Sequence, residues 1–293
     1  MTTKLLHAVV NGVLGGGVYA LMAVGLTLIF GVLDIINIAQ GIMVVLGAYL
    51  SYALSVHLHL DLFLGLLLTV PAMFVIGVAI QWAFIRPLRG RERTSMSLLA
   101  CYAVAIIIEG VLSVIFGVDY LQLHASYTDS TFHIFGFYLP YIYLYGFVMA
   151  VALVVALYGL LYRTKFGRSV RATMQNQTAA RLIGINVNRV AALTFGIGVA
   201  VTAAGGMVFG ATSGGINPNS GYDLISRLLA VIILGGLGSI GGALAAAVFM
   251  LTAEAIVDIW YPTWSVAVFY AALVVVLTYR PQGLFGRQEA RAL

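Results

Sequence analysis

The sequence predicts an all-α membrane protein with about eight helical segments, seven of them crossings and one a re-entrant, glycine-broken hairpin. Three observations lead to this fold class: the composition, the length of the uncharged runs and the position of the basic residues. Of the 293 residues 62% are hydrophobic and 9% charged, with a mean hydropathy of +1.04. A soluble domain carries about 25% charged residues. The composition therefore excludes a cytosolic enzyme, a disordered chain and a nucleic-acid-binding domain, despite a pI near 9.3.

The uncharged runs predict the individual helices, because each is long enough to cross the ~30 Å hydrocarbon core. In chain order they cover residues 5–33, 35–60, 62–85, 94–118 (interrupted only by Glu109), 130–162, 190–222, 228–253 and 259–279. The first run exceeds the roughly 7–15 apolar residues of a signal peptide, so we expect a retained helix. The single cysteine, Cys101, rules out an intrachain disulfide. The five histidines lack metal-ligand spacing, so no metal site is predicted.

The basic residues predict the topology, because lysine and arginine collect in cytoplasmic loops. Most of the 15 lie at 86–93, at 163–189 and in the C-terminal tail. Three segments separate the second of these stretches from the tail, so one segment must fail to cross. The candidate contains Leu234-Gly-Gly-Leu-Gly-Ser-Ile-Gly-Gly242. We expect a half-helix at about 224–235, a break at the glycines and a return through about 241–257, which requires burial or a cavity.

The same count predicts a cytoplasmic C-terminus and an N-terminus outside the cell. Lys4, as a basic residue, argues instead for a cytoplasmic N-terminus. The polar segment 34–41 is a candidate for a second break. Glycines also recur at four-residue spacing, as in the pair Gly12 and Gly16, which allows close helix packing. Such spacing fits packing within one bundle, a subunit interface or a moving seam.

The long basic loop at 163–190 is the main candidate for an interaction with another molecule. Residues 175–183 predict a helix with an apolar patch at Ala179, Leu182 and Ile183, and Gly184 is suited to end it with a positive φ. Two interpretations are open on the residues alone. The helix could dock in a groove of a soluble partner, or the loop could lie on anionic lipid headgroups.

Three stretches resemble the permeases of branched-chain amino-acid-type ABC importers, and most of all the LivH-type subunit. They are the Gly-Arg-Ser-Val-Arg-Ala…Ala-Ala-Arg-Leu-Ile-Gly-Ile-Asn-Val pattern at 167–187, Asn11-Gly…Gly31 leading to Ile36-Asn-Ile-Ala-Gln-Gly41, and 235–243 followed by Arg280-Pro-Gln-Gly-Leu-Phe-Gly286. The resemblance covers nearly the whole chain in order. Gln40 stands where the family usually has histidine, which puts a pH-sensing role there in doubt.

The resemblance implies one permease domain over residues 1–293 in the inner membrane of a prokaryote. Its expected partners are a second, LivM-type permease subunit, two ABC ATPases and an extracytoplasmic solute-binding protein. The sequence contains no Walker A motif, so ATP and Mg²⁺ are expected on the ATPases and no cofactor in this chain. The family's coupling loop maps onto 163–190, with ATPase contacts expected at Arg171, Asn176, Ala179, Ala180, Arg181, Leu182 and Gly184.

Polar and glycine residues inside the apolar segments are the candidates for the translocation pathway. Glu109 stands alone in its run, and an intramembrane carboxylate marks a functional candidate. Hydrogen bonding to a neighbouring helix is the simpler alternative. Lining the pathway and pinning a helix turn are equally open for the polar cluster near 34–41. The full set expected along the pathway is Asn37, Gln40, Gly41, Glu109, Gly235, Gly236, Gly238 and Ser239.

The outer loops are the candidates for contact with the solute-binding protein. The longest, residues 119–140, also contains His133 and Tyr138. Asp223 and Arg227 are four residues apart, which predicts a helical ion pair. Glu254 and Asp258 are expected on a solvated outer rim. The residues expected to contact the binding protein are Tyr120, His124, Tyr127 and Asp223.

The combined prediction is a subunit that moves a branched-chain amino acid or a related small polar solute by alternating access, without covalent chemistry. Relatives that carry urea, amides or aromatic acids leave the solute open. A stand-alone secondary transporter or channel is the alternative from another class. A membrane-embedded enzyme would need clustered catalytic groups, which Glu109 alone does not supply.

Overall fold

Eight helices in the computed structural model are long and apolar enough to cross a membrane, and the all-α membrane fold is confirmed. The structure describes all residues except 1, 89–92, 124–130, 135–136 and 287–293. The candidate spans are α1 (Thr2–Leu33), α2 (Gln40–Leu58), α3 (Leu62–Ile80) with its π-helical continuation η1 (Gln81–Ile85), α4 (Arg93–Phe116), α5 (Tyr141–Arg163), α8 (Val187–Thr212), α10 (Ile240–Asp258) and α11 (Pro262–Tyr279).

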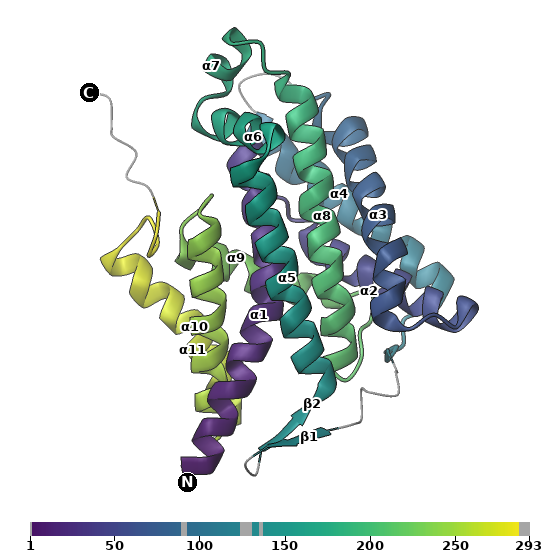
Figure 1. Ribbon diagram of the computed structural model, residues 1–293, viewed down its shortest axis with the longest axis vertical. Helices are drawn as coiled ribbons and strands as arrows, with labels where there is room; N and C mark the ends of the chain where they lie inside the picture. The colour runs from purple at the N-terminus through teal and green to yellow at the C-terminus, as the bar shows by residue number, and fades with distance from the viewer. Residues whose placement is uncertain (1, 89–92, 124–130, 135–136, 287–293) are drawn as a thin grey trace.

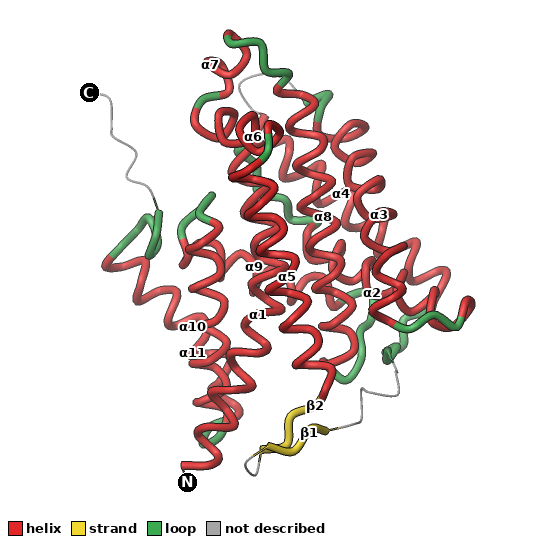
Figure 2. Tube along the Cα trace, viewed as in Figure 1, coloured by secondary structure: helices red, strands yellow, loops and turns green. Residues whose placement is uncertain are grey.

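The remaining elements are shorter and lie between the spans. Two helices, α6 (Lys165–Gln175) and α7 (Gln177–Leu182), connect α5 to α8, and α9 (Ser220–Gly235) precedes α10. The strands β1 (Thr131–Ile134) and β2 (Phe137–Pro140) form a small antiparallel hairpin that the sequence does not predict. Figure 2 shows this hairpin at the opposite end of the bundle from α7. We call these the hairpin end and the α7 end.

The re-entrant segment differs from its prediction in length and in its first half. The helix of 16 residues begins at Ser220, four residues before the expected start, and α10 alone has the length of a span. The uncharged run 190–222 is therefore not one helix, because α8 ends at Thr212 and a turn follows. Asn217 Oδ1 accepts a hydrogen bond from the Ser220 amide at 2.9 Å, and Gly214 has a φ of +74°. The turn residues 213–219 carry no charge, so they do not interrupt the uncharged run. The end of α8 is therefore not visible in the positions of the charged residues.

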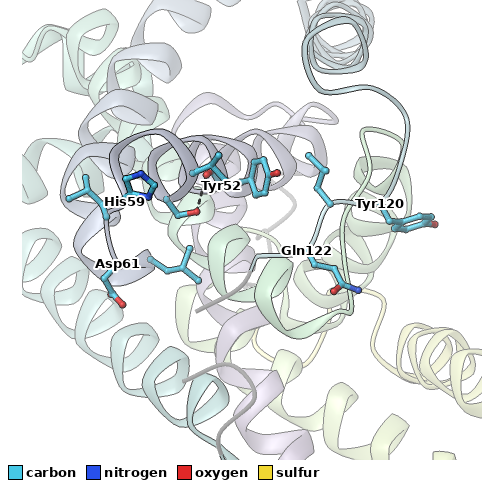
Figure 3. Close-up of a pocket in the computed structure, with 10 residues that line it drawn as sticks. Tyr52, His59, Asp61, Tyr120 and Gln122 are labelled. Atoms are coloured by element: carbon cyan, nitrogen blue, oxygen red, sulfur yellow. Dashed lines mark hydrogen bonds between the residues drawn. The ribbon is translucent and has the colours of Figure 1, made fainter. Parts of the chain in front are cut away.

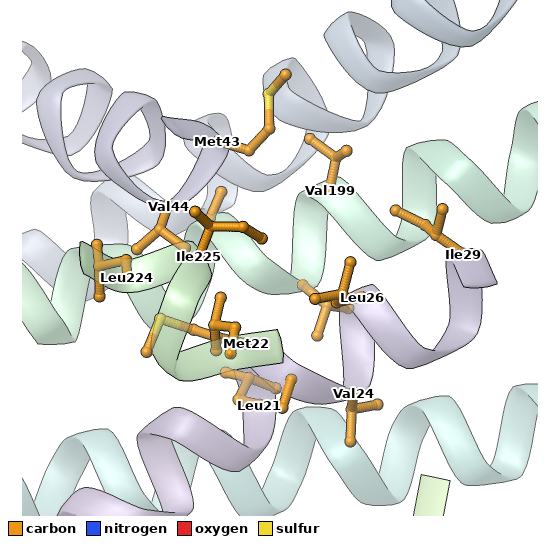
Figure 4. Packing of buried hydrophobic residues seen from close by; sticks show 14 of the residues in the cluster. Leu21, Met22, Val24, Leu26, Ile29, Met43, Val44, Val199, Leu224 and Ile225 are labelled. Carbon is orange, nitrogen blue, oxygen red and sulfur yellow. The ribbon is translucent and has the colours of Figure 1, made fainter. Parts of the chain in front are cut away.

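The centre of the bundle is formed by α1 and α8, most of whose residues are buried. In Figure 1, α10 and α11 lie on one side of α1, and α2, α3 and α4 lie on the other. The N-terminus is at the hairpin end, and α6 and α7 are at the opposite end. Figure 4 shows the core where Met22, Val44, Val199 and Ile225 come together from α1, α2, α8 and α9. Because α9 contributes to this core, it is held inside the bundle.

Glycine spacing in α1 brings two helix backbones into contact. A Cβ atom on Gly12 would lie 2.5 Å from Thr252 Cα, and one on Gly16 would lie 2.7 Å from Val248 Cα. Both contacts are with α10. Small residues at a helix interface permit such approach where lipid provides no hydrophobic drive for association.

Replacing Gly16 with isoleucine is expected to separate α1 from α10 and to lower the melting temperature of the purified protein. The reason is that the new side chain would overlap the backbone of Val248, which cannot rotate away. Gly15 provides the matched control, since a Cβ there meets nothing within 4 Å. Thermal unfolding in detergent checks the prediction. Equal melting temperatures for Gly16→Ile and Gly15→Ile would contradict it.

Candidate translocation and coupling sites

The loop 163–190 forms two helices rather than the single helix expected at 175–183. Thr164 caps α6 by accepting a hydrogen bond from the Gly167 amide at 3.0 Å. Asn176 then interrupts the helix with extended backbone, and its side chain caps α7 through the Ala179 amide at 2.9 Å. Asparagine competes for backbone groups in this way, which makes it a helix boundary. Gly184 has a φ of +85° after the last turn, as the sequence predicts.

The helix α7 has one face held on the bundle and one face open. Ala180 is buried, and Gln177 Nε2 donates to the Val32 carbonyl at the end of α1 over 2.9 Å. In contrast, Leu182 is 84% exposed and Ile183 is 73% exposed. Two neighbouring apolar side chains so exposed are a surface suited to a protein partner.

The structure separates Arg171 from the other expected coupling residues. It lies on α6, where its guanidinium carbon is 4.7 Å from the centroid of the Tyr162 ring. The exposed members of the expected set, all on or beside α7, are Asn176, Ala179, Arg181, Leu182 and Gly184. Within the expected set, Arg171 packs against Tyr162 and Ala180 is buried. The other five residues are open to a partner.

The segment between α1 and α2 is a break in the middle of the bundle. Asp34 has a φ of +57°, and the helix resumes only at Gln40. Gln40 Nε2 donates to Thr202 Oγ1, and Thr202 Oγ1 donates to the Met22 carbonyl at 3.2 Å. Thr202 lies about 15 residues into α8, a depth of about 22 Å at 1.5 Å per residue. Therefore α2 begins deep in the membrane region.

Two polar side chains of this break bond to one another, and Gln40 also bonds to α8. Asn37 Nδ2 donates to Gln40 Oε1 at 2.7 Å, and both residues are buried. Gly41 lies against the backbone of α9. These contacts pin the start of α2. A role for Asn37, Gln40 and Gly41 in the translocation pathway stays a prediction.

The second break, between α9 and α10, is covered by the C-terminal segment. The Leu284 amide donates to the Leu234 carbonyl at 2.8 Å, and the Phe285 amide donates to the Gly235 carbonyl at 3.2 Å. A broken helix leaves backbone groups without partners inside the helix, but these two carbonyls are paired. Low-polarity surroundings make an unpaired carbonyl costly, so the chain supplies donors from about 50 residues downstream.

The same break also lies close to α6. Gly236 and Gly238 have φ values of +98° and +78°, and Ser239 Oγ caps α10 through the Gly242 amide at 3.1 Å. A Cβ on Gly31 would lie 3.7 Å from Gly238 Cα and would overlap the Met174 side chain of α6. The end of α1 thus stands between the α9–α10 break and the connecting helices.

A salt bridge joins α9 to α10 inside the bundle. Arg227 Nη1 donates to Glu254 Oε2 at 2.9 Å, with 21% and 14% of the two side chains exposed. The guanidinium carbon of Arg227 lies 5.3 Å from the Phe269 ring centroid. The expected pair of Arg227 with Asp223 is therefore wrong, and Glu254 is not on a solvated rim. The antiparallel return of α10 brings Glu254 to Arg227, which sequence spacing does not reveal.

Glu109 contacts α9 from α4. Its Oε2 accepts a hydrogen bond of 2.6 Å from the Tyr222 hydroxyl, 113 residues along the chain. Tyr222 itself is 40% exposed. Among the expected pathway residues, Glu109, Gly238 and Ser239 are only partly buried.

A cleft at the C-terminal end of α2 is lined in part by Tyr120, one of the expected binding-protein contacts. It has a volume of about 830 Å³ and is shown in Figure 3, with Tyr52, His59, Asp61, Tyr120 and Gln122 around it. Residues 120–122 are held in place because Leu121 pairs with Ile216 and Gln122 Nε2 donates to the Gly214 carbonyl at 2.8 Å. Asp223 is exposed in the first turn of α9. The other two expected contacts, His124 and Tyr127, lie outside the described residues.

Sequence reasoning missed the α10 partner of Arg227, the cover over the second break and this cleft. The signal for the first was present, since Glu254 follows directly on an uncharged run and is the nearest acid after Arg227 in the sequence. The C-terminal cover had a weaker signal, the Gly-Leu-Phe-Gly turn after Arg280. The sequence contains no signal for the cleft, because the cleft forms where the turn after α2 meets residues 120–122 in space.

Comparison with known proteins assigns the family. The pattern described as "Branched-chain amino acid transport system / permease component" matches residues 8–277. The high-affinity branched-chain amino acid transport system permease proteins BraD of Pseudomonas aeruginosa and LivH of Escherichia coli are 29% and 30% identical, each over 97% of this chain and 96% of the relative. LivM of Salmonella typhimurium is 28% identical over 47% of this chain and 34% of its own length. No solved structure matches.

These relatives are permease components, which are non-catalytic transmembrane subunits of ABC transport systems and hold no cofactor. The helical fold and the family pattern cover the same part of the chain. The chain is a multi-pass membrane protein, and it belongs to the branched-chain amino acid transport permease family.

Proposed function

We propose that this chain translocates a branched-chain amino acid, or a related small polar solute, across the inner membrane of a prokaryote by alternating access. Its ATP-driven cycle would use two ABC ATPases, a second permease subunit of the LivM type and an extracytoplasmic solute-binding protein. The α7 end and the C-terminus face the cytoplasm in this proposal, and the N-terminus faces the outside. The basic residues of 163–189 support this orientation.

The observation that carries the proposal is the exposed apolar tip of α7 on a firmly attached helix. Leu182 and Ile183 project where an ATPase groove would receive them, while Gln177 is bonded to the end of α1. A movement of α7 would therefore be transmitted to α1. Through Gly31, α1 contacts the α9–α10 break, so the docking surface and the interior of the bundle are connected by direct contacts.

The proposed solute rests on the names of the relatives. The permease proteins BraD and LivH carry branched-chain amino acid transport in their names, at about 30% identity. Urea, amides and aromatic acids are the alternatives. Binding measurements on the solute-binding protein that accompanies the chain would separate these classes.

Purification of the tagged chain from its native membrane in mild detergent tests the proposal. We expect two Walker-containing ATPases and a second permease in the mass spectrum, and ATP-dependent uptake after reconstitution of the complex. A chain that is isolated alone and moves solute in liposomes without ATP would overturn the proposal. That outcome would establish the secondary transporter or channel instead.

A further inference from the structure

One side of α9 is open along its length, although the helix lies inside the bundle. Its buried positions include Leu224, Leu228 and Val231. Four other residues at helical spacing are exposed or only partly buried, namely Tyr222, Ser226, Leu229 and Ile233. We call these four the open face of α9. The polar half of this face is near the start of the helix and the apolar half is near the break.

The charged residues of the membrane region gather at this helix. Among the described residues of the candidate spans and α9, three Asp, Glu, Lys or Arg side chains lie more than one turn inside their helix: Glu109, Arg227 and Glu254. Glu109 is hydrogen-bonded to Tyr222 on the open face, and Arg227, five residues further along α9, is paired with Glu254 of α10. The interior charges of α4 and α10 thus both make their contacts with α9.

Lipid is a poor environment for such groups. Charged side chains in membrane segments face a bundle interior or a water-filled cavity because burying them in hydrocarbon is costly. Glu109 and Tyr222 are too exposed in this subunit for its own helices to shield them. Water or another protein surface must therefore cover the open face in the assembled transporter.

The charge of this surface favours a cationic group. Arg227 is neutralised by Glu254, so that Glu109 and Asp223 leave an excess of two negative charges along the start of α9. The Tyr222 hydroxyl holds one oxygen of Glu109, and a carboxylate has a second oxygen that accepts hydrogen bonds. An ammonium group is a donor of matching charge.

We propose that the open face of α9 lines a water-filled solute path, in which the Glu109 carboxylate contacts the ammonium group of the solute. Tyr222 is the positioning residue, because its hydroxyl orients that carboxylate. The inference rests on the proposed transport function and adds the place and the chemical class of the solute contact.

Thiol labelling of the assembled transporter in native membrane vesicles tests the path. The background is Cys101→Ala, which removes the one natural cysteine, and the probe position is Ser226→Cys. Leu67→Cys on α3 is the matched control, because Leu67 is 72% exposed on a helix face with no charged side chain and is expected in lipid. The probes are a cationic and an anionic water-soluble methanethiosulfonate. Leu229→Cys repeats the test one turn along the same face.

We expect Ser226→Cys to react about tenfold faster than Leu67→Cys, because only a thiol in water ionises to the reactive thiolate. The cationic reagent is expected to react faster than the anionic one, and Glu109→Gln is expected to remove part of that preference. Glu109→Gln should also raise the KM for an amino acid, with a smaller change in kcat. Tyr222→Phe should give a weaker form of the same change.

Labelling of Ser226→Cys and Leu229→Cys at the slow rate of Leu67→Cys would overturn the inference. Equal rates with both reagents and an unchanged KM in Glu109→Gln would overturn the role of the carboxylate. The proposed function is overturned by a different result, a chain that is isolated alone and moves solute in liposomes without ATP. A complex that contains ATPases but has an unreactive Ser226→Cys would overturn the proposed solute path and would still support the proposed importer function.

Discussion

Replacement of Leu182 by glutamate is expected to abolish ATP-driven import, with a loss of at least about a hundredfold, or ~2.8 kcal/mol at 1.4 kcal/mol per tenfold change. Leu182 is 84% exposed at the tip of α7, so it contributes little to the packing of this chain. Burial of a leucine in a partner groove is worth about 1.5–3 kcal/mol. A carboxylate in the same groove would lose that energy and would also have to be desolvated.

Uptake into vesicles and solute-stimulated ATP hydrolysis measure this effect. Leu182→Met is the matched control, since it keeps the volume and the apolar character, and it should retain import. The melting temperature of Leu182→Glu should stay close to that of the unmodified chain. Normal uptake by Leu182→Glu would show that α7 is not the docking surface and would favour the lipid-contact interpretation of this loop.

Replacement of Gly236 by valine is expected to destabilise the protein by about 3 kcal/mol, combining backbone strain with lost hydrogen bonds. Gly236 has a φ of +98°, which a β-branched residue rarely adopts. A Cβ there would also overlap the Gly286 amide nitrogen. The C-terminal segment would have to move away, and the Leu234 and Gly235 carbonyls would lose their donors.

Thermal unfolding in detergent and the uptake assay together check this second prediction. Gly241→Val is the matched control, because a Cβ at Gly241 meets nothing within 4 Å and its φ is not positive. Truncation after Arg280 should reproduce the loss, since it removes the same two donors. If Gly236→Val and Gly241→Val unfold at the same temperature, the C-terminal segment does not stabilise the break.

Much of the fold follows from local properties of the chain. Length and apolarity of a run are sufficient to predict a span, because every residue in the hydrocarbon core contributes to the cost of insertion. The eight candidate spans correspond to the eight uncharged runs, although the sixth run includes a turn and the start of α9. The glycine-rich break and the positive φ of Gly184 were also predictable, since glycine tolerates backbone conformations that other residues avoid.

The depth of the break before α2 depended on tertiary structure. The segment 34–41 is polar in sequence, but only its hydrogen bonds to Thr202 show that Gln40 lies well inside the bundle. The same is true of Glu109. Its charge was visible at once, whereas the Tyr222 hydroxyl that holds it comes from a helix 113 residues away.

The sequence by itself therefore determined the membrane fold, the apolar runs that contain the spans and the glycine-rich break before α10. Tertiary structure decided which residues meet: Arg227 with Glu254 rather than Asp223, and Leu284 with Leu234. The physical reason is that membrane helices are apolar on nearly every side, so their sequences lack the periodic pattern that identifies a packing face in water. The pairing of helices is then set by close packing and by hydrogen bonds between polar groups. Both depend on the arrangement of the whole bundle.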